Sequence, residues 1–109
     1  MVQKLRIQDA IEEIDGRPYH PVELARVNAQ LVRLAFFKGD YHWHKHQNEE
    51  ELFLVHTGEI VLQVEGQEDL VLGEGELAVV PTGVSHRPRS DEGAYVLMFE
   101  PARLVSTGD

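Results

Sequence analysis

The chain has 109 residues, of which 19 are acidic and 10 are basic, giving a formal net charge of −9 at pH 7, and it contains no cysteine. This length predicts a single domain, residues 1–109, that can bury a core of its own. The acidic balance repels phosphate backbones, so we expect no nucleic-acid partner. The absence of cysteine excludes disulfides, thiolate zinc sites and a cysteine nucleophile. We see neither a signal segment nor an apolar run of roughly 20 residues, so we expect a cytoplasmic protein with no membrane partner.

The chain begins with a helical pattern. Ile7, Ile11 and Ile14 follow helical spacing and predict a short amphipathic helix within residues 4–14. The Gly16-Arg17-Pro18 segment ends it. We therefore divide the chain into three parts: an N-terminal helix and arm (1–21), a β-barrel core (22–101) and a C-terminal tail (102–109).

The rest of the chain predicts short strands separated by Gly and Pro turns. Alternating or continuous apolar residues mark each strand, and Gly39-Asp40 ends the second one. We expect the strand before Pro81 to be buried. Many short strands with one minor helix indicate an all-β sandwich or barrel. In chain order the predicted strands are Val22 to Val27, Gln30 to Lys38, Glu51 to His56, Ile60 to Val64, Leu70 to Leu72, Leu77 to Val80 and Ala94 to Phe99.

The most informative motif is His44-Lys45-His46. We place it on a strand that opens after Gly39, where residues two apart point to the same side, so that both imidazoles can bind one metal ion. Glu51 begins the following strand, and the Pro81-Thr82-Gly83 turn can direct His86 back toward the barrel mouth. Together these side chains would supply three ring nitrogens and one carboxylate oxygen.

The spacing of these residues resembles the two motifs of the cupin superfamily, which span residues 39–90 here. The first motif matches at Gly39, His44, His46, Glu51 and Gly58, and the second at Gly75, Pro81, Gly83 and His86. The sequence departs from the family motifs at two points, and neither of them is a metal ligand. Only four residues separate Gly39 from His44, where five is common, and Ser90 stands where Asn is usual.

The resemblance implies a double-stranded β-helix, also called a jelly roll, with His44, His46, Glu51 and His86 around one divalent transition metal. These ligand types admit Zn, Mn, Fe, Ni or Cu. A six-coordinate ion would keep two positions open for a small-molecule substrate. The resemblance favours a dioxygenase or isomerase acting on a small oxygenated molecule, with catalytic residues unknown. The alternative is a non-catalytic module that binds or senses a small molecule or metal, and a homodimer is expected in either case.

Other residues near the motifs have less specific interpretations. Glu50 is the alternative carboxylate ligand, but the six-residue step to Gly58 favours Glu51, and Glu50 should then face outward. His42 lies two residues before His44 and could point to the same side, but we interpret it as a histidine in a loop. His56 falls on the face opposite Glu51 and is interpreted as a surface or packing residue, and His20 has no assigned role.

The residues that line the pocket depend on the register of the strands, which the sequence does not determine. The apolar residues expected mainly in the core are Phe37, Phe53, Val55, Leu62, Val79 and Met98. Polar handles for a ligand, each with a surface alternative, are Tyr41, Gln63 and Tyr95. Arg87 and Arg89 flank His86 and could bind an anion, but solvated charges on an exposed loop are the favoured interpretation. No general base is evident outside the ligand set.

Overall fold

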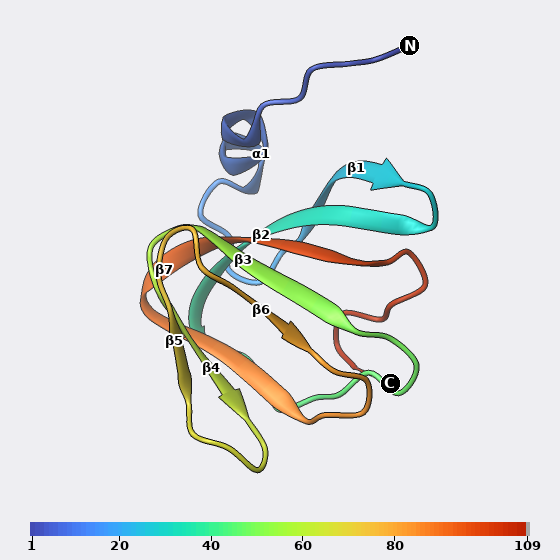
Figure 1. The fold of residues 1–109 in the computed structure, drawn as a ribbon. Helices are drawn as coiled ribbons and strands as arrows, with labels where there is room; N and C mark the ends of the chain where they lie inside the picture. Colours follow the sequence, from blue (N-terminus) through green and yellow to red (C-terminus); the bar gives the residue numbers. More distant parts are fainter. Residues whose placement is uncertain (109) are drawn as a thin grey trace.

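A computed structural model of the protein describes residues 1–108, and within them one helix lies beside a seven-stranded β-barrel (Figure 1). The predicted all-β class with a short N-terminal helix is confirmed. Of the predicted tail, residue 109 lies outside the described residues. The elements are α1 (Ile7–Ile14), β1 (Val22–Val27), β2 (Gln30–Asp40), β3 (Glu51–Thr57), β4 (Ile60–Val64), β5 (Leu70–Leu72), β6 (Leu77–Val80) and β7 (His86–Pro101).

Strand β7 joins the two layers of the barrel (Figure 1). Its first part, from His86 to Arg89, pairs with β4, which also pairs with β5. Its second part, from Ala94 to Pro101, pairs with β2 and β3, and the order on that side is β1-β2-β7-β3-β6. All of these pairings between strands are antiparallel. The jelly-roll barrel therefore encloses one interior between its two layers.

Ser90 holds the bend at the middle of β7. Its hydroxyl donates to the carbonyl of Glu59 at 2.7 Å and accepts from the backbone N–H of Gly93 at 3.1 Å. Gly93 has a φ of +102°, and an added Cβ there would lie 2.6 Å from the ring of Phe36, so a side chain does not fit. The serine found at the usual asparagine position thus ties β7 to the start of β4.

The two faces of β2 pack into different cores because its side chains alternate. Ala35 and Phe37 point into the barrel and join its apolar interior. Leu34 points the other way and is covered by Ala10 and Ile14 of α1. The helix of Figure 1 therefore stabilises the outer side of β2, away from the barrel interior.

Several sequence predictions about the strands need correction. Strand β2 continues through Gly39 to Asp40, with a register shift between Phe37 and Gly39, where the sequence predicted a break. The last strand begins at His86, well before the predicted Ala94, because the polar half of β7 does not look like a strand in sequence.

The predicted burial of β6 is also wrong in part. Val80 is buried, but Leu77 is 54% exposed and Val79 49% exposed, because β6 lies at the edge of its sheet with one face outward. Phe99 of β7 is exposed on the same layer. The homodimer expected from the sequence stays a prediction. Among the described residues, no helix combines the length and apolar character needed to cross a membrane.

Candidate metal centre

The four predicted ligand residues come from three segments that the fold brings together. His44 and His46 lie in the connection after β2, Glu51 is the first residue of β3, and His86 is the first residue of β7. The prediction that the two nearby histidines share a strand is wrong. Apart from a single bridge at His44, the segment 41–50 is irregular.

The irregular segment is fixed by individual backbone hydrogen bonds and not by the regular pairing of a strand. The N–H of His44 donates to the carbonyl of His86 at 3.0 Å, and the N–H of His86 donates back to His44 at 2.9 Å. The N–H of Gly83 donates to the carbonyl of His46 at 2.8 Å, and Gly83 has a φ of +79°, which glycine adopts without strain. The sequence predicted that the Pro81–Gly83 turn directs His86, and the structure adds that this turn also holds the backbone of His46.

The side chains of this set converge on one point. One donor atom from each of the four residues lies within 4.8 Å of all the others. Glu51 Oε1 lies 3.3 Å from His46 Nε2 and 3.6 Å from His86 Nε2. Donors bound at about 2.1 Å lie up to about 4.2 Å apart across an ion, so a contraction of about half an ångström would suit one metal. His46, Glu51 and His86 are buried and His44 is partly buried.

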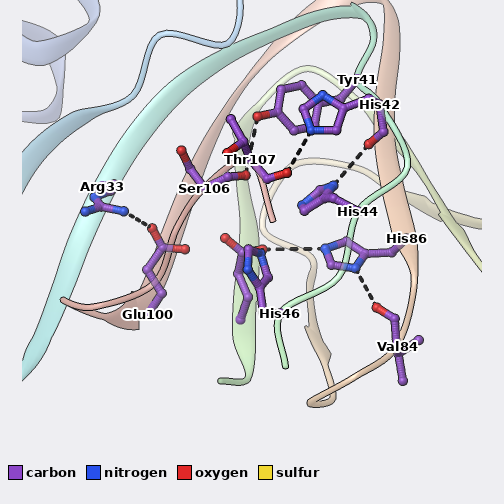
Figure 2. Close-up of polar contacts among 11 residues, drawn as sticks. Arg33, Tyr41, His42, His44, His46, Val84, His86, Glu100, Ser106 and Thr107 are labelled. Carbon is purple, nitrogen blue, oxygen red and sulfur yellow. Dashed lines mark hydrogen bonds and ion pairs between the residues drawn. The ribbon is translucent and has the colours of Figure 1, made fainter. Parts of the chain in front are cut away.

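Backbone carbonyls set the tautomers of two of the imidazoles (Figure 2). The Nδ1 of His86 lies 2.9 Å from the carbonyl oxygen of Val84, and the Nδ1 of His44 lies 3.0 Å from that of His42. A carbonyl can only accept, so each Nδ1 carries the hydrogen and each Nε2 presents a lone pair. Hydrogen bonds of this kind, made by the ring nitrogen that does not bind the metal, orient histidine ligands in metal sites.

The electrostatics of the cluster favour neutral imidazoles around an ionised carboxylate. Burial lowers the pKa of His44 to about 4 and outweighs the opposing effect of its bond to His42. Burial alone would raise the pKa of Glu51, but its neighbouring side chains, His46 first among them, hold it well below its usual range. Lone pairs and a negative charge then face one another, and a cation among them satisfies all of these groups at once.

A cavity opens beside this cluster. His44 and Glu51 form its polar side, and Tyr19, Phe37 and Phe53 form part of its wall. The cavity has a volume of about 40 Å³, which is room for roughly three water molecules. The hydroxyl of Tyr19 donates to the carbonyl of Gly39 at 2.7 Å, so this ring is fixed in the wall. A ligand in this cavity would lie between the apolar interior and the donor cluster.

The structure decides between the alternatives left open among the acids and histidines. Glu51 is buried in the cluster and Glu50 is exposed, as predicted for a strand in which neighbours alternate. His42 lies in the connection and its Nε2 is 2.9 Å from the carbonyl oxygen of Thr107, so it is a loop histidine. His56 is partly buried on the opposite face of β3, and His20 is exposed.

The polar residues considered as ligand handles separate into two groups. Tyr41 lines the cavity, whereas Tyr95 packs against Phe36 on the outer side. Gln63 is occupied by Arg87, whose Nε donates to it at 2.6 Å. Arg87 and Arg89 lie on β7, which corrects their placement on an exposed loop.

Sequence reasoning missed one buried polar residue of the cavity, Glu100. Its Oε1 accepts from Arg33 at 2.7 Å (Figure 2). Burial and the neighbouring Glu51 carboxylate raise the pKa of Glu100 to about 9, against the opposing effect of Arg33. A signal was available: Ala94, Val96, Met98 and Glu100 share one parity along β7, so an acid ends a row that points inward.

Comparisons with known proteins agree with this geometry. The family model described as the Cupin domain matches residues 37–100. The uncharacterized protein YdbB of Bacillus subtilis (strain 168) is 40% identical over 67 residues, which are 62% of this chain and 59% of that protein, so the match spans less than two thirds of this relative.

Two solved structures show how far the likeness extends. A cupin-2 domain containing protein from Shewanella frigidimarina NCIMB 400 is 27% identical, with a TM-score of 0.84 over 89% of this chain and 93% of that one. DMSP lyase DddQ from Ruegeria pomeroyi DSS-3 is 21% identical, with a TM-score of 0.67 over 78% of this chain and 47% of that one, and this likeness concerns the fold alone. With the family model covering more than half of the chain, including all four clustered donors, the protein belongs to the cupin family.

Proposed function

We propose that this cupin binds one divalent transition metal through His44, His46, Glu51 and His86, and acts as a metal-dependent enzyme on a small oxygenated molecule. Zn, Mn, Fe, Ni and Cu all suit three imidazoles and a carboxylate. The observation that carries the proposal is the pair of carbonyl contacts at His42 and Val84, which turn the Nε2 lone pairs of His44 and His86 toward the Glu51 carboxylate.

The roles of the individual residues follow from their contacts. His44 and His86 keep their orientation through Nδ1, while Glu51 supplies the negative charge that a divalent ion needs. The rings of Tyr19, Phe37 and Phe53 form an aromatic wall of the space beside the donors. A metal held there would supply Lewis acidity toward an oxygen-containing ligand, or activate oxygen.

Dioxygenase or isomerase chemistry is the reaction type proposed. Four protein donors on a six-coordinate ion leave room for two oxygens of a ligand, and the cavity lies on the side of His44 and Glu51. Cupin relatives do not by themselves choose the reaction, because one fold hosts many activities. A non-catalytic binding module would use the same donors and the same cavity, so turnover separates the two functions.

The first experiment measures metal content by elemental analysis after exchange against each of the five candidate metals. We expect about one equivalent of at least one metal in the wild type and less than about a tenth in His46→Ala. The control His56→Ala changes a histidine on the opposite face of β3 and should keep its metal. Absence of metal uptake by the wild type with all five metals would sink the proposal.

The second experiment tests catalysis on the metal-loaded protein. Oxygen consumption and product analysis are followed with a panel of small diols, diketones and hydroxy acids. Metal-dependent turnover that His46→Ala abolishes is the expected result. Saturable binding of a panel member without turnover under any metal would assign the protein to the non-catalytic class.

A further inference from the structure

The C-terminal tail lies against the donor cluster and takes no part in the proposed metal site. Its residues 105–108 pass beside the connection between β2 and β3 (Figure 2). The hydroxyl of Tyr41 donates to the carbonyl of Ser106 at 3.3 Å, and the Nε2 of His42 donates to the carbonyl of Thr107 at 2.9 Å. The tail is therefore attached to the same connection that carries two of the clustered histidines.

The tail borders two hollows that meet at one donor residue. Ser106 lines the inner cavity beside the cluster, together with His44. Thr107 and Gly108 line a second hollow on the outside, again together with His44 and with the half-exposed ring of Trp43. Because His44 belongs to both hollows, the tail forms part of the wall between them. Displacing it would join the two hollows and open the His44 side of the cluster to solvent.

Gly108 brings the backbone of the tail close to this donor residue. It has a φ of +98°, and an added Cβ would lie 2.8 Å from the Cβ of His44 and 3.2 Å from the carbonyl oxygen of Lys45. Both distances are shorter than ordinary van der Waals contacts, so a side chain does not fit while the tail is in place. A larger residue at this position must move the tail away from His44.

Few interactions hold the tail beyond its anchor, Leu104, which is 4% exposed. Within residues 1–108, no strand pairing includes residues 105–108. The N–H of Gly108 donates at 2.9 Å to the carbonyl of Val105, inside the tail itself. Hydrogen bonds from two side chains to carbonyls add little net free energy, and segments with few buried contacts open at low cost. Opening after Leu104 should therefore cost far less than unfolding.

We propose that residues 105–108 form a lid on the metal centre, which opens after Leu104 and controls how fast an ion reaches His44. The proposal rests on the metal site proposed above. Tyr41 and His42 hold the lid through backbone carbonyls, so the closed position does not depend on the side chains of the tail. All four donor residues lie outside the lid. The lid should therefore change the rates of metal entry and exit and leave the affinity nearly unchanged.

The test measures Co²⁺ association by stopped flow and Co²⁺ loss to excess chelator. The wild type is compared with a variant that ends at Leu104. We expect both rates to rise roughly tenfold in the shortened protein, because two hydrogen bonds no longer oppose opening. The dissociation constant should stay within about threefold. A tail that merely supports the donors would instead raise the exit rate alone and weaken binding.

Point variants make the same comparison within the full chain. Gly108→Val should raise both rates, because its side chain cannot fit beside His44, and it serves as the decisive variant if the shortened protein does not fold. Thr107→Ala is the matched control: Thr107 is exposed and is held by its carbonyl, so the rates should equal those of the wild type.

The outcomes separate the lid from the metal site. Co²⁺ uptake at the same rates in the wild type and in the shortened protein overturns the lid alone, as does a faster exit with weaker affinity and an unchanged entry rate. No Co²⁺ uptake by the wild type overturns the metal site and the lid together.

Discussion

Two buried regions of this protein share strand β2 but differ in composition. On the outer side, Leu34 packs against Ala10 and Ile14 of α1, and this cluster is apolar throughout. On the inner side, Ala35 and Phe37 belong to a barrel interior that continues toward His86, Glu51 and Glu100. The apolar layer can only stabilise the fold, whereas the inner side also holds groups that are costly to bury and useful only with a partner.

This difference implies that stability and metal binding can be changed separately. The donors of the inner site are oriented by backbone carbonyls within short loops, at Val84 and His42, and not by the helix. Loss of packing under α1 should therefore leave the donors in place while the folded state remains populated. Loss of a donor should affect metal binding far more than the folded state of the metal-free protein.

The largest expected effect is on stability, from Leu34→Ala. Leu34 is fully buried against α1, and truncating a buried leucine costs about 2–5 kcal/mol through lost burial and the remaining cavity. Urea unfolding measures the loss, and elemental analysis of the folded variant should still give the wild-type metal content. Val71→Ala, at a residue 58% exposed on β5, should change stability by about 0.5 kcal/mol or less. Loss of metal from folded Leu34→Ala would show that the two regions are coupled.

Glu51→Gln should show the opposite of Leu34→Ala: it should lose metal affinity and keep most of its stability. Removing the only carboxylate of the donor set lowers metal affinity by roughly 100-fold or more, which is about 2.7 kcal/mol. The metal-free protein should keep most of its stability, because the amide has the shape of the carboxylate and its oxygen can still accept a hydrogen bond from the protonated carboxyl of Glu100. Competition with a chelator measures affinity and urea unfolding measures stability.

Glu50→Gln is the matched control for this variant, since Glu50 is the exposed neighbour of Glu51. It should change neither metal affinity nor stability. A loss of metal in Glu50→Gln, with metal retained in Glu51→Gln, would reverse the assignment of the carboxylate ligand.

A third prediction concerns pH and isolates Glu100 in the metal-free protein. Its pKa in the folded state is raised from 4.5 to about 9, first by burial and then by Glu51, so the folded state holds a proton that the unfolded chain releases. The contribution to stability is complete below pH 4.5 and is lost as the pH rises toward 9. From pH 5 to pH 9 the urea midpoint of the wild type should fall more than that of Glu100→Gln. Parallel pH profiles for the two proteins would contradict the raised pKa.

Much of the fold and the identity of the clustered donors could be predicted from the sequence. Apolar runs between turn residues predicted β3 and β5, and apolar alternation predicted β4. The two spaced motifs predicted that His44 and His86 would meet although they lie 42 positions apart. The alternation argument failed for His44 and His46, because tertiary hydrogen bonds to His86 and Gly83 replace the strand there.

The remaining features depend on pairings that local sequence does not encode. The polar first half of β7 forms a strand because β4 pairs with it, and Val79 is exposed because β6 is an edge strand. Glu100 was missed because an acid on a strand is normally read as outward-facing, and its burial depends on the register that places it beside Leu31 and within reach of Arg33. Such partners become visible only when the strands are assembled.

The smallest expected effect comes from the end of α1. It tests whether the stability of the outer layer depends on how well this helix is capped. Asp15 is the C-cap of α1 and has a left-handed backbone, with a φ of +52° and a ψ of +46°. Glycine adopts this conformation with less strain than other residues, so Asp15→Gly should stabilise the protein by about 0.5–1 kcal/mol. Asp15→Ala, which keeps a Cβ and loses the local hydrogen-bonding capacity of aspartate, should be destabilised by a similar amount. Because this cap ends the helix that packs on the outer side of β2, metal affinity should be the same in both variants. A shift in metal affinity that follows the shift in stability would mean that the helix layer and the inner site respond as one unit.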